Sequence, residues 1–177
     1  EIIHICEDKK CQSKGSLFSA IQFHRHDIFN WLIETKGEDP FEEEQSKIAK
    51  FIVQYFNIDA MINLLQRGFN PNLFILPAIE CGNLLLIEYL ATIQHLNFND
   101  KLPLNKKKTY PIIYASVVGF NCDMIKFLIK YCKCDMNQRG KSGLTPLHFA
   151  CLNNDEETVN FLIKQKNIEI NAATKIF

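Results

Sequence analysis

The chain has 177 residues, of which 47% are apolar and 23% are charged, an ordinary balance for a globular protein that can bury a core of its own. Its net charge is zero, and none of its apolar runs approaches the roughly 20 residues that a membrane span requires. No phosphate loop, nucleophile elbow or paired-carboxylate motif is present, so the sequence predicts neither catalytic residues nor a cofactor.

The first residues, EIIHICEDKKC, place charged side chains where a secretory signal would need an apolar stretch. His4, Cys6 and Cys11 could bind zinc, but a structural zinc site needs four ligands with tighter spacing. A frayed helix end is the preferred interpretation, and no metal site is predicted. Because the chain lacks an initiator Met, we expect a piece of a longer protein, with residues 1–15 forming a truncated repeat or an N-terminal cap.

From residue 17 onward, apolar residues recur three and four positions apart, as expected for short amphipathic helices. The pattern repeats with one layout: an anchor residue in a first helix is followed by two apolar residues in a second helix. The five anchors, separated by 33, 25, 37 and 35 residues, are Ala20, Val53, Ala78, Ala115 and Ala150. Neither helix of such a pair can bury its apolar stripe alone, so neighbouring pairs must stack into a solenoid.

Two connections between the repeated units are unusual. The acidic segment at residues 38–44, EDPFEEE, lacks the alternation and the glycine of a calcium loop and is expected to be a solvated linker. The short spacing between the second and third units leaves no room for a connecting loop near residues 66–74. We therefore expect an irregular stack at that joint.

The stretch GLTPLHFAC at residues 143–151 carries the most specific motif. Thr145 can cap a helix and Pro146 suits its first turn. The run from Thr145 to Ala150, together with Gly143 two residues before Thr145, resembles the ankyrin repeat. The motif residues are Thr145, Pro146, Leu147, His148 and Ala150. In such repeats the histidine hydrogen-bonds within and between turns, so the resemblance implies a structural role for His148, not a catalytic pair with Cys151.

The resemblance covers nearly all of residues 16–177 and implies an all-α fold, an ankyrin-type solenoid of about five helix-turn-helix repeats with short β-turn fingers. It is most specific at residues 143–163, whereas Tyr-Pro-Ile-Ile at residues 110–113 replaces the Thr-Pro-Leu-His run. The expected repeats span residues 16–40, 41–72 (degenerate), 73–108, 109–142 and 143–170, and residues 171–177 begin a further repeat.

In ankyrin-like repeats, the pair of residues that directly follows the core positions of the first helix faces the concave surface. In unit order, the first of these contact positions holds Gln22, Tyr55, Glu80, Val117 and Leu152, and the second holds Phe23, Phe56, Cys81, Val118 and Asn153. Exposed apolar residues in a row predict a groove for an apolar segment of a partner. The candidate contacts are Phe23, Tyr55, Phe56, Val117, Val118 and Leu152. Two alternatives remain open: the second unit is misaligned by one residue, which would put Tyr55 or Phe56 in the core, or flanking repeats cover the row.

Basic residues cluster around the fourth unit. Residues 1–100, by contrast, are acidic overall, with 8 Lys and Arg against 14 Asp and Glu. The cluster comprises Lys101, Lys106, Lys107, Lys108, Lys133, Arg139 and Lys141, and we expect it at the two fingers beside that unit. A solubilising loop face and contact with an acidic protein segment are the leading interpretations. Nucleic acid is a weaker one, because stacking aromatics are scarce nearby. Lys107, Arg139 and Lys141 are the candidate steering charges.

Seven cysteines, an odd number, are scattered along the chain, and several lie in apolar helical patterns. Such residues behave as small hydrophobes, which favours free thiols and a cytoplasmic location. The sequence as a whole predicts a non-catalytic module that binds another protein and no small-molecule substrate. The alternatives are a structural spacer within a longer repeat protein and a zinc-binding or redox-sensing segment at His4, Cys6 and Cys11.

Overall fold

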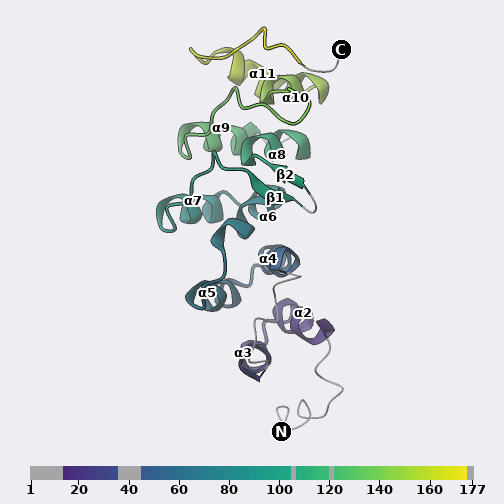
Figure 1. Ribbon diagram of the computed structural model, residues 1–177, viewed down its shortest axis with the longest axis vertical. Helices are drawn as coiled ribbons and strands as arrows, with labels where there is room; N and C mark the ends of the chain where they lie inside the picture. The colour runs from purple at the N-terminus through teal and green to yellow at the C-terminus, as the bar shows by residue number, and fades with distance from the viewer. Residues whose placement is uncertain (1–13, 36–44, 105–106, 120–121, 175–177) are drawn as a thin grey trace. The chain divides into compact units, whose positions relative to one another are not determined.

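The computed structural model describes residues 14–35, 45–104, 107–119 and 122–174. The chain forms two compact units, residues 1–77 and residues 78–177, each built mainly of short helices (Figure 1). The prediction of an all-α protein with few strands is confirmed. The proposed zinc ligands at residues 4–11, the acidic segment at 38–44 and Lys106 lie outside the described residues.

The first unit consists of two helix pairs and a short 3-10 helix. The helices are α2 (Lys14–Gln22), α3 (His26–Thr35), α4 (Gln45–Gln54) and α5 (Ile58–Gln66), and they are followed by η2 (Pro71–Phe74). Within the unit, α2 packs on α4 and α3 packs on α5. Ile21, Phe29 and Ile52 are fully buried between them because each helix turns one apolar stripe toward its neighbour.

Helix α6 (Ile75–Glu80) leads into the second unit, which contains α7 (Leu84–Thr92), α8 (Pro111–Val118), α9 (Cys122–Lys130), α10 (Pro146–Leu152) and α11 (Glu156–Ile163). Here α8 packs on α10 and α9 packs on α11. An antiparallel hairpin of β1 (Leu102–Leu104) and β2 (Lys107–Thr109) precedes α8 and forms a finger. The two layers of helices, α6, α8 and α10 beside α7, α9 and α11, are visible in Figure 1.

The same turn joins the two helices of four pairs. One residue takes a left-handed conformation, and the next N–H donates to the carbonyl five residues earlier, a common way to end a helix. These hydrogen bonds run from Arg25 to Ala20 (2.9 Å), Asn57 to Ile52 (3.0 Å), Asn83 to Ala78 (2.9 Å) and Asp155 to Ala150 (2.9 Å). The left-handed residues are His24, Phe56, Gly82 and Asn154; Gly119 after α8 also has a positive φ (+80°), but its ψ of 163° makes it a different turn.

These turns show that the expected alignment of the second repeat, residues 41–72, is wrong by one residue. The anchor that matches Ala20 and Ala78 is Ile52, not Val53, and in the helix that follows Met61 is buried whereas Ile62 is 42% exposed. Tyr55 therefore occupies the second contact position, and Phe56 lies in the turn. Adjacent apolar pairs allow either register, so periodicity alone could not separate them.

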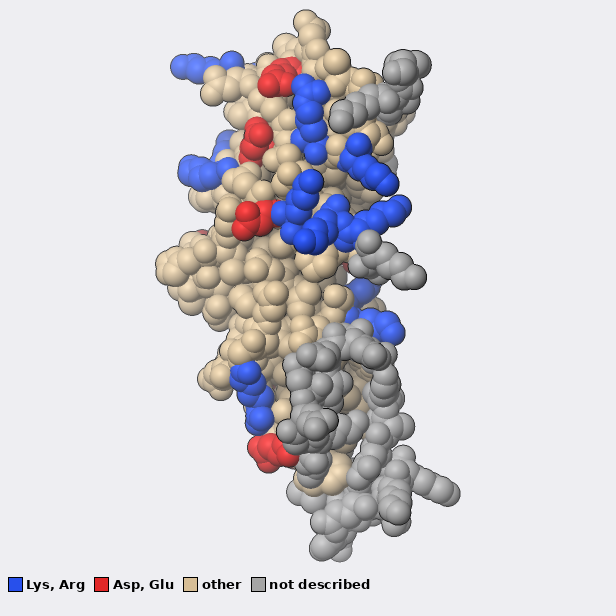
Figure 2. Space-filling view, in the orientation of Figure 1, with Lys and Arg blue, Asp and Glu red and all other residues tan. Residues whose placement is uncertain are grey.

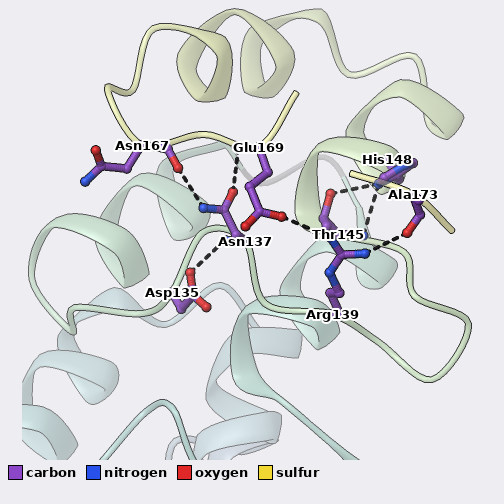
Figure 3. Close-up of polar contacts among 8 residues, drawn as sticks. All are labelled: Asp135, Asn137, Arg139, Thr145, His148, Asn167, Glu169 and Ala173. Atoms are coloured by element: carbon purple, nitrogen blue, oxygen red, sulfur yellow. Dashed lines mark hydrogen bonds and ion pairs between the residues drawn. The ribbon is translucent and has the colours of Figure 1, made fainter. Parts of the chain in front are cut away.

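Asparagine side chains join the successive connecting segments of the second unit. The Asn99 amide donates to the Lys133 carbonyl (3.0 Å) and accepts from the Asp135 N–H (2.9 Å). The Asn137 amide does the same one repeat later, with the Asn167 carbonyl at 2.7 Å and the Glu169 N–H at 2.9 Å (Figure 3). Each asparagine thus satisfies backbone groups of the next segment that no regular structure would pair.

The Thr-Pro-Leu-His run forms the start of α10. Thr145 is the buried N-cap, and Pro146 is the first helical residue. The Thr145 N–H donates to His148 Nδ1 at 3.2 Å, so this nitrogen is an acceptor, and the Thr145 hydroxyl lies 2.8 Å from it (Figure 3). The side chain of His148 is thereby engaged in its own turn, in the reciprocal arrangement of a capping box.

Candidate functional site

The inner helices of the second unit expose apolar side chains at their last turns. Val117 and Val118 at the end of α8 and Leu152 at the end of α10 are all exposed. Earlier residues of α8, including Ile112 and Ala115, are buried against neighbouring helices. Because α8 and α10 pack side by side, these exposed residues form one apolar surface.

A cavity of about 240 Å³ opens between the ends of α6 and α8. Its lining residues are Ile79, Glu80, Cys81, Gly82, Ala115, Val118, Gly119 and Met124. Cys81 and Val118 occupy the second contact position of two successive repeats, so the cavity lies on the surface that the sequence pattern indicated. The short side chain of Cys81 and the two glycines leave the space unfilled.

The next junction along the unit is closed by a side chain. Asn153, at the same position of α10 that Val118 holds in α8, donates from its amide to the Ser116 carbonyl at 3.1 Å. A Cβ added to Gly119 would lie 3.4 Å from that amide nitrogen, so the amide sits directly against the glycine. The space that is open between α6 and α8 is thus filled between α8 and α10.

The first unit also exposes aromatic residues at its turns. Phe23 and Phe56 are largely exposed, whereas Tyr55 is half-buried and packs on Phe51 with ring centroids 5.6 Å apart. His24 Nε2 lies 3.1 Å from the Tyr55 carbonyl, which holds the two turns side by side. Phe56 has a φ of +52°, an unusual conformation for an aromatic residue. Tyr55 and Phe56 are therefore not core residues, but only Tyr55 matches Phe23 in position.

A family model described as ankyrin repeats (3 copies) matches residues 74–174, more than half of the chain. The chain belongs to the ankyrin-repeat family. The predicted ankyrin solenoid is confirmed by this match together with the stacked helix pairs. Ankyrin repeats are generally modules for protein–protein interaction, and the family is typically non-catalytic.

Two much longer proteins are similar to this ankyrin chain. Alpha-latrocrustotoxin-Lt1a of Latrodectus tredecimguttatus is 23% identical over 208 residues, which cover 89% of this chain and 14% of the toxin. The transient receptor potential cation channel subfamily A member 1 of Homo sapiens is 27% identical over 113 residues, which cover 64% of this chain and 7% of the channel. The chain therefore spans only a small part of the length of either relative.

Basic side chains gather on one face of the ankyrin chain's second unit, about the fingers (Figure 2). Lys107 and Lys108 are exposed on β2, and Lys141 is exposed in the loop before α10. The Lys101 ammonium lies 5.1 Å from the centroid of the Tyr110 ring, a cation–π contact at the start of α8.

Arg139, in contrast, is engaged within the chain. Its guanidinium donates to the Ala173 carbonyl at 2.6 Å and to the Glu169 carboxylate at 3.0 Å (Figure 3). Its charge is therefore paired and its geometry fixed, which sequence reasoning could not foresee because the partners lie at least 30 residues away. Lys107 and Lys141, the other two candidate steering charges, are exposed.

Two cysteines of the fourth repeat are unsuited to thiol chemistry. Burial raises the pKa of the Cys132 thiol to about 11 and also raises the pKa of Cys134, so little thiolate forms near neutral pH. In the described residues, no group of three or more His, Cys, Asp or Glu side chains could hold a metal ion. Across the same residues, no helix is long and apolar enough to cross a membrane.

Sequence reasoning missed part of the cavity. Cys81 and Glu80 were placed at contact positions but were not chosen as contacts, and Gly119 and Met124 were not considered. The sequence signal for this cavity was a small residue at a contact position, Cys81, together with a glycine, Gly119, in the turn of the next repeat. This pairing predicts space between two inner helices, because neither residue can fill it.

Proposed function

We propose that this chain is a non-catalytic module that binds a partner protein against the inner helix ends and fingers of its second unit. The observation that supports this proposal is the open cavity between α6 and α8, continuous with the exposed side chains of Val117 and Val118. Buried anchors in such pockets usually carry most of the binding energy of an interface.

The basic fingers supply the second element of the proposal. Lys107 and Lys141 would attract an acidic segment and accelerate its association, with a modest effect on the final affinity. In the first unit, Phe23, Tyr55 and Phe56 are proposed as an additional apolar contact set. Their exposure supports this role for the two phenylalanines in particular.

The test uses two variants that each place two glutamates on the surface. Val118→Glu/Leu152→Glu charges the inner surface, and Leu85→Glu/Ile163→Glu charges exposed apolar positions on the outer helices α7 and α11. Proteins captured from a cell lysate by each variant and by the original chain are then quantified by mass spectrometry. Circular dichroism establishes first that both variants remain helical.

We expect the inner variant to lose a captured protein that the outer variant retains. Equal retention by both variants would remove the inner surface as the binding site. A chain that captures no specific protein with either surface intact would favour the alternative of a structural spacer.

We also propose a cytoplasmic location, which the scattered free cysteines support. Cys122 and Cys134 are buried as small apolar side chains, as expected where thiols stay reduced. Fluorescence microscopy of the tagged full-length protein tests this proposal. A secreted product, or one with several oxidised cysteines, would contradict it.

A further inference from the structure

The last two outer helices of the second unit end in side chains that are basic or apolar and point into solvent. Helix α9 ends at Lys130 and α11 ends at Ile163, and the residues that follow them are Tyr131 and Lys164. Tyr131 is 71% exposed and Ile163 is 44% exposed. We call this surface the outer edge. It comprises Lys130, Tyr131, Lys133, Ile163, Lys164 and Lys166, all of which are exposed.

The outer edge is continuous across two repeats. Helix α9 packs on α11, and the Lys130 ammonium lies 5.6 Å from the centroid of the Phe161 ring. The segment after α11 is held by Asn137, whose amide donates to the Asn167 carbonyl at 2.7 Å. Packed helices lie about 8–10 Å apart, so the two helix ends present their side chains on one short stretch of surface.

The lysines of the outer edge keep their positive charge for a partner. Among the described residues, none of the four forms an ion pair with a carboxylate. Lys133 donates to the Lys130 carbonyl at 2.7 Å, which fixes its ammonium at the end of α9. Four positive charges thus lie together without a neutralising partner, and they attract an anionic surface.

Acidic side chains separate the outer edge from the basic fingers. Asp135 accepts a hydrogen bond from the Asn137 N–H at 2.9 Å, and Glu169 accepts one from the Arg139 guanidinium at 3.0 Å. Both carboxylates are therefore engaged by the segment that leads to α10. In Figure 2, acidic side chains likewise lie between the basic side chains on the left edge of the second unit and those of the fingers. The outer edge and the fingers are two distinct basic surfaces.

Tyr131 has the properties of a rigid apolar anchor. Its ring stacks on that of Phe127, with the centroids 4.7 Å apart and an interplanar angle of 25°. Phe127 is half-buried, so it supports one side of the Tyr131 ring while most of that ring contacts water. Ile93, which follows α7 as Tyr131 follows α9, is 63% exposed. A tyrosine ring with lysines beside it suits the boundary between a polar and an apolar phase, because each side chain has an apolar body and a polar tip.

An anionic lipid bilayer matches both features of the outer edge. Its headgroups attract clustered lysines, and each lysine near the surface strengthens binding about fivefold. The boundary between headgroups and acyl chains accepts tyrosine rings and aliphatic side chains. A single-stranded nucleic acid would also attract the lysines, but it binds through stacked aromatic rings. The other exposed apolar residues here, Ile93 and Ile163, are aliphatic and offer no such ring.

We infer that the outer edge docks on the anionic surface of a lipid bilayer. Tyr131 and Ile163 enter the headgroup region, and the four lysines contact the lipid phosphates. The chain lies on the bilayer in this arrangement and does not span it. This inference is independent of the proposed protein partner, because it uses a different surface of the second unit.

The experiment measures flotation of the full chain with vesicles. Vesicles of phosphatidylcholine with about 30% phosphatidylserine represent the anionic cytoplasmic leaflet, and vesicles of phosphatidylcholine alone are the neutral comparison. We expect binding to the anionic vesicles only, and a decrease in that binding as salt is added. Circular dichroism establishes that each variant below remains helical.

Two pairs of variants locate the contact. Lys164→Gln/Lys166→Gln should weaken binding about 25-fold, because two lysines contribute about fivefold each. Lys107→Gln/Lys108→Gln makes the same change in net charge at the finger and should have little effect.

Tyr131→Ser should weaken binding about three- to tenfold, whereas Tyr131→Trp should preserve it. Leu85→Ser, at an exposed position near the start of α7, is the matched control and should leave binding unchanged.

Three results would overturn the inference. The first is an absence of binding to the anionic vesicles. The second is an equal loss for the two lysine variants, which would assign the binding to net charge or to the fingers. The third is full binding by Tyr131→Ser, which would mean that no side chain enters the headgroup region. A labelled single-stranded oligonucleotide that binds more tightly than the vesicles, and is lost on Lys164→Gln/Lys166→Gln, would replace the bilayer by a nucleic acid. None of these results bears on the proposed function, which Val118→Glu/Leu152→Glu tests separately.

Discussion

The two units join their repeats by different means. In the first unit, the buried amide of Asn57 donates to the Ile21 carbonyl of the preceding repeat at 2.8 Å and caps α5 through a 3.0 Å hydrogen bond from the Ala60 N–H. In the second unit, the amides of Asn99 and Asn137 join the connecting segments at the molecular surface. The first unit thus has a fully buried link between its repeats, whereas the second unit is joined by exposed links in its connecting segments and by the part-buried bond from Asn153 to the Ser116 carbonyl.

The difference matters because burial changes the cost of losing a hydrogen bond. Asn57 is 2% exposed, so its removal leaves the buried Ile21 carbonyl with only a 3.3 Å hydrogen bond from the His24 N–H. Groups released at the surface can instead bond to water. The first unit, whose turns are also joined by His24 at the Tyr55 carbonyl, should therefore be most sensitive to the loss of Asn57, and the second unit should be less sensitive to the loss of any one exposed link.

The largest effect is expected for Asn57→Ala. Losing the cap costs about 1 kcal/mol, and losing the buried hydrogen bond to the Ile21 carbonyl, which keeps only the 3.3 Å bond from the His24 N–H, costs about 0.5–1.5 kcal/mol. We therefore expect about 1.5–2.5 kcal/mol of destabilisation in urea unfolding. The control is Asn83→Ala, which removes the matching cap bond to the Leu86 N–H (3.0 Å) and should cost only about 1 kcal/mol. Equal losses of unfolding free energy for the two variants would contradict a greater stabilising contribution from the buried hydrogen bond in the first unit.

A smaller and local effect is expected for Asn137→Ala. The variant loses the hydrogen bonds to the Asn167 carbonyl and the Glu169 N–H, worth about 1–2 kcal/mol together. Amide hydrogen exchange around Glu169 should accelerate roughly 5- to 30-fold, with little change in α5. Lys141→Ala, at an exposed position, serves as the control. Unchanged exchange at residues 167–169 would show that the asparagine link contributes nothing.

Phe56→Gly should stabilise the first unit slightly. A left-handed conformation costs a non-glycine residue about 1–2 kcal/mol, and the exposed ring contributes little packing. After subtracting the greater flexibility of glycine in the unfolded chain, we expect a net gain of about 0.5–1 kcal/mol in thermal unfolding. The reciprocal change Gly119→Ala, at a φ of +80°, should be destabilising. A destabilised Phe56→Gly variant would indicate that the ring makes contacts worth more than the strain.

The smallest effect concerns the ion pairs between outer helices. Lys126 of α9 donates to Glu157 of α11 at 2.6 Å, whereas Arg67, the C-cap of α5, and Glu34 of α3 are 3.5 Å apart. The bond to Glu157 raises the pKa of Lys126 above its usual value. A raised pKa in the folded state means that the contribution is complete below the unfolded pKa of about 10.4 and is lost as the pH rises through the folded pKa.

The matching measurement compares Lys126→Met with Arg67→Met in urea at several pH values. The cost of Lys126→Met should be constant between pH 7 and pH 9, shrink above about pH 10.4 and fall in high salt. Arg67→Met should show no such change at high pH because arginine stays charged. A cost for Lys126→Met that grows above that pH would have the wrong sign for this pairing.

The sequence was sufficient for the fold because several signals agreed. Thr145, Pro146 and His148 mark the start of an inner helix, and the apolar spacing repeats around Ala78, Ala115 and Ala150. In the second repeat, residues 41–72, the motif is missing, and two neighbouring apolar residues stand at each core position. The signal that would have fixed the register is Asn57, which caps its helix as Asn83 and Asp155 do.

The proposed binding surface was only partly predictable. Exposed apolar residues such as Val118 follow from the repeat pattern, but a cavity depends on which space the neighbouring side chains leave empty. The pairing of Arg139 with Glu169 and the Ala173 carbonyl depends on the path of a loop that no local pattern describes. Long-range contacts of this kind require coordinates.

The contrast between Val118 and Asn153 has a consequence for how such arrays change over time. At this position of the repeat, an asparagine fills the junction between two inner helices, whereas a valine beside Cys81 leaves a cavity there. A substitution at that one position can open or close a cavity while the helices on either side keep their packing. Single substitutions can therefore add, remove or move cavities along an ankyrin array without changing the interactions that keep it folded.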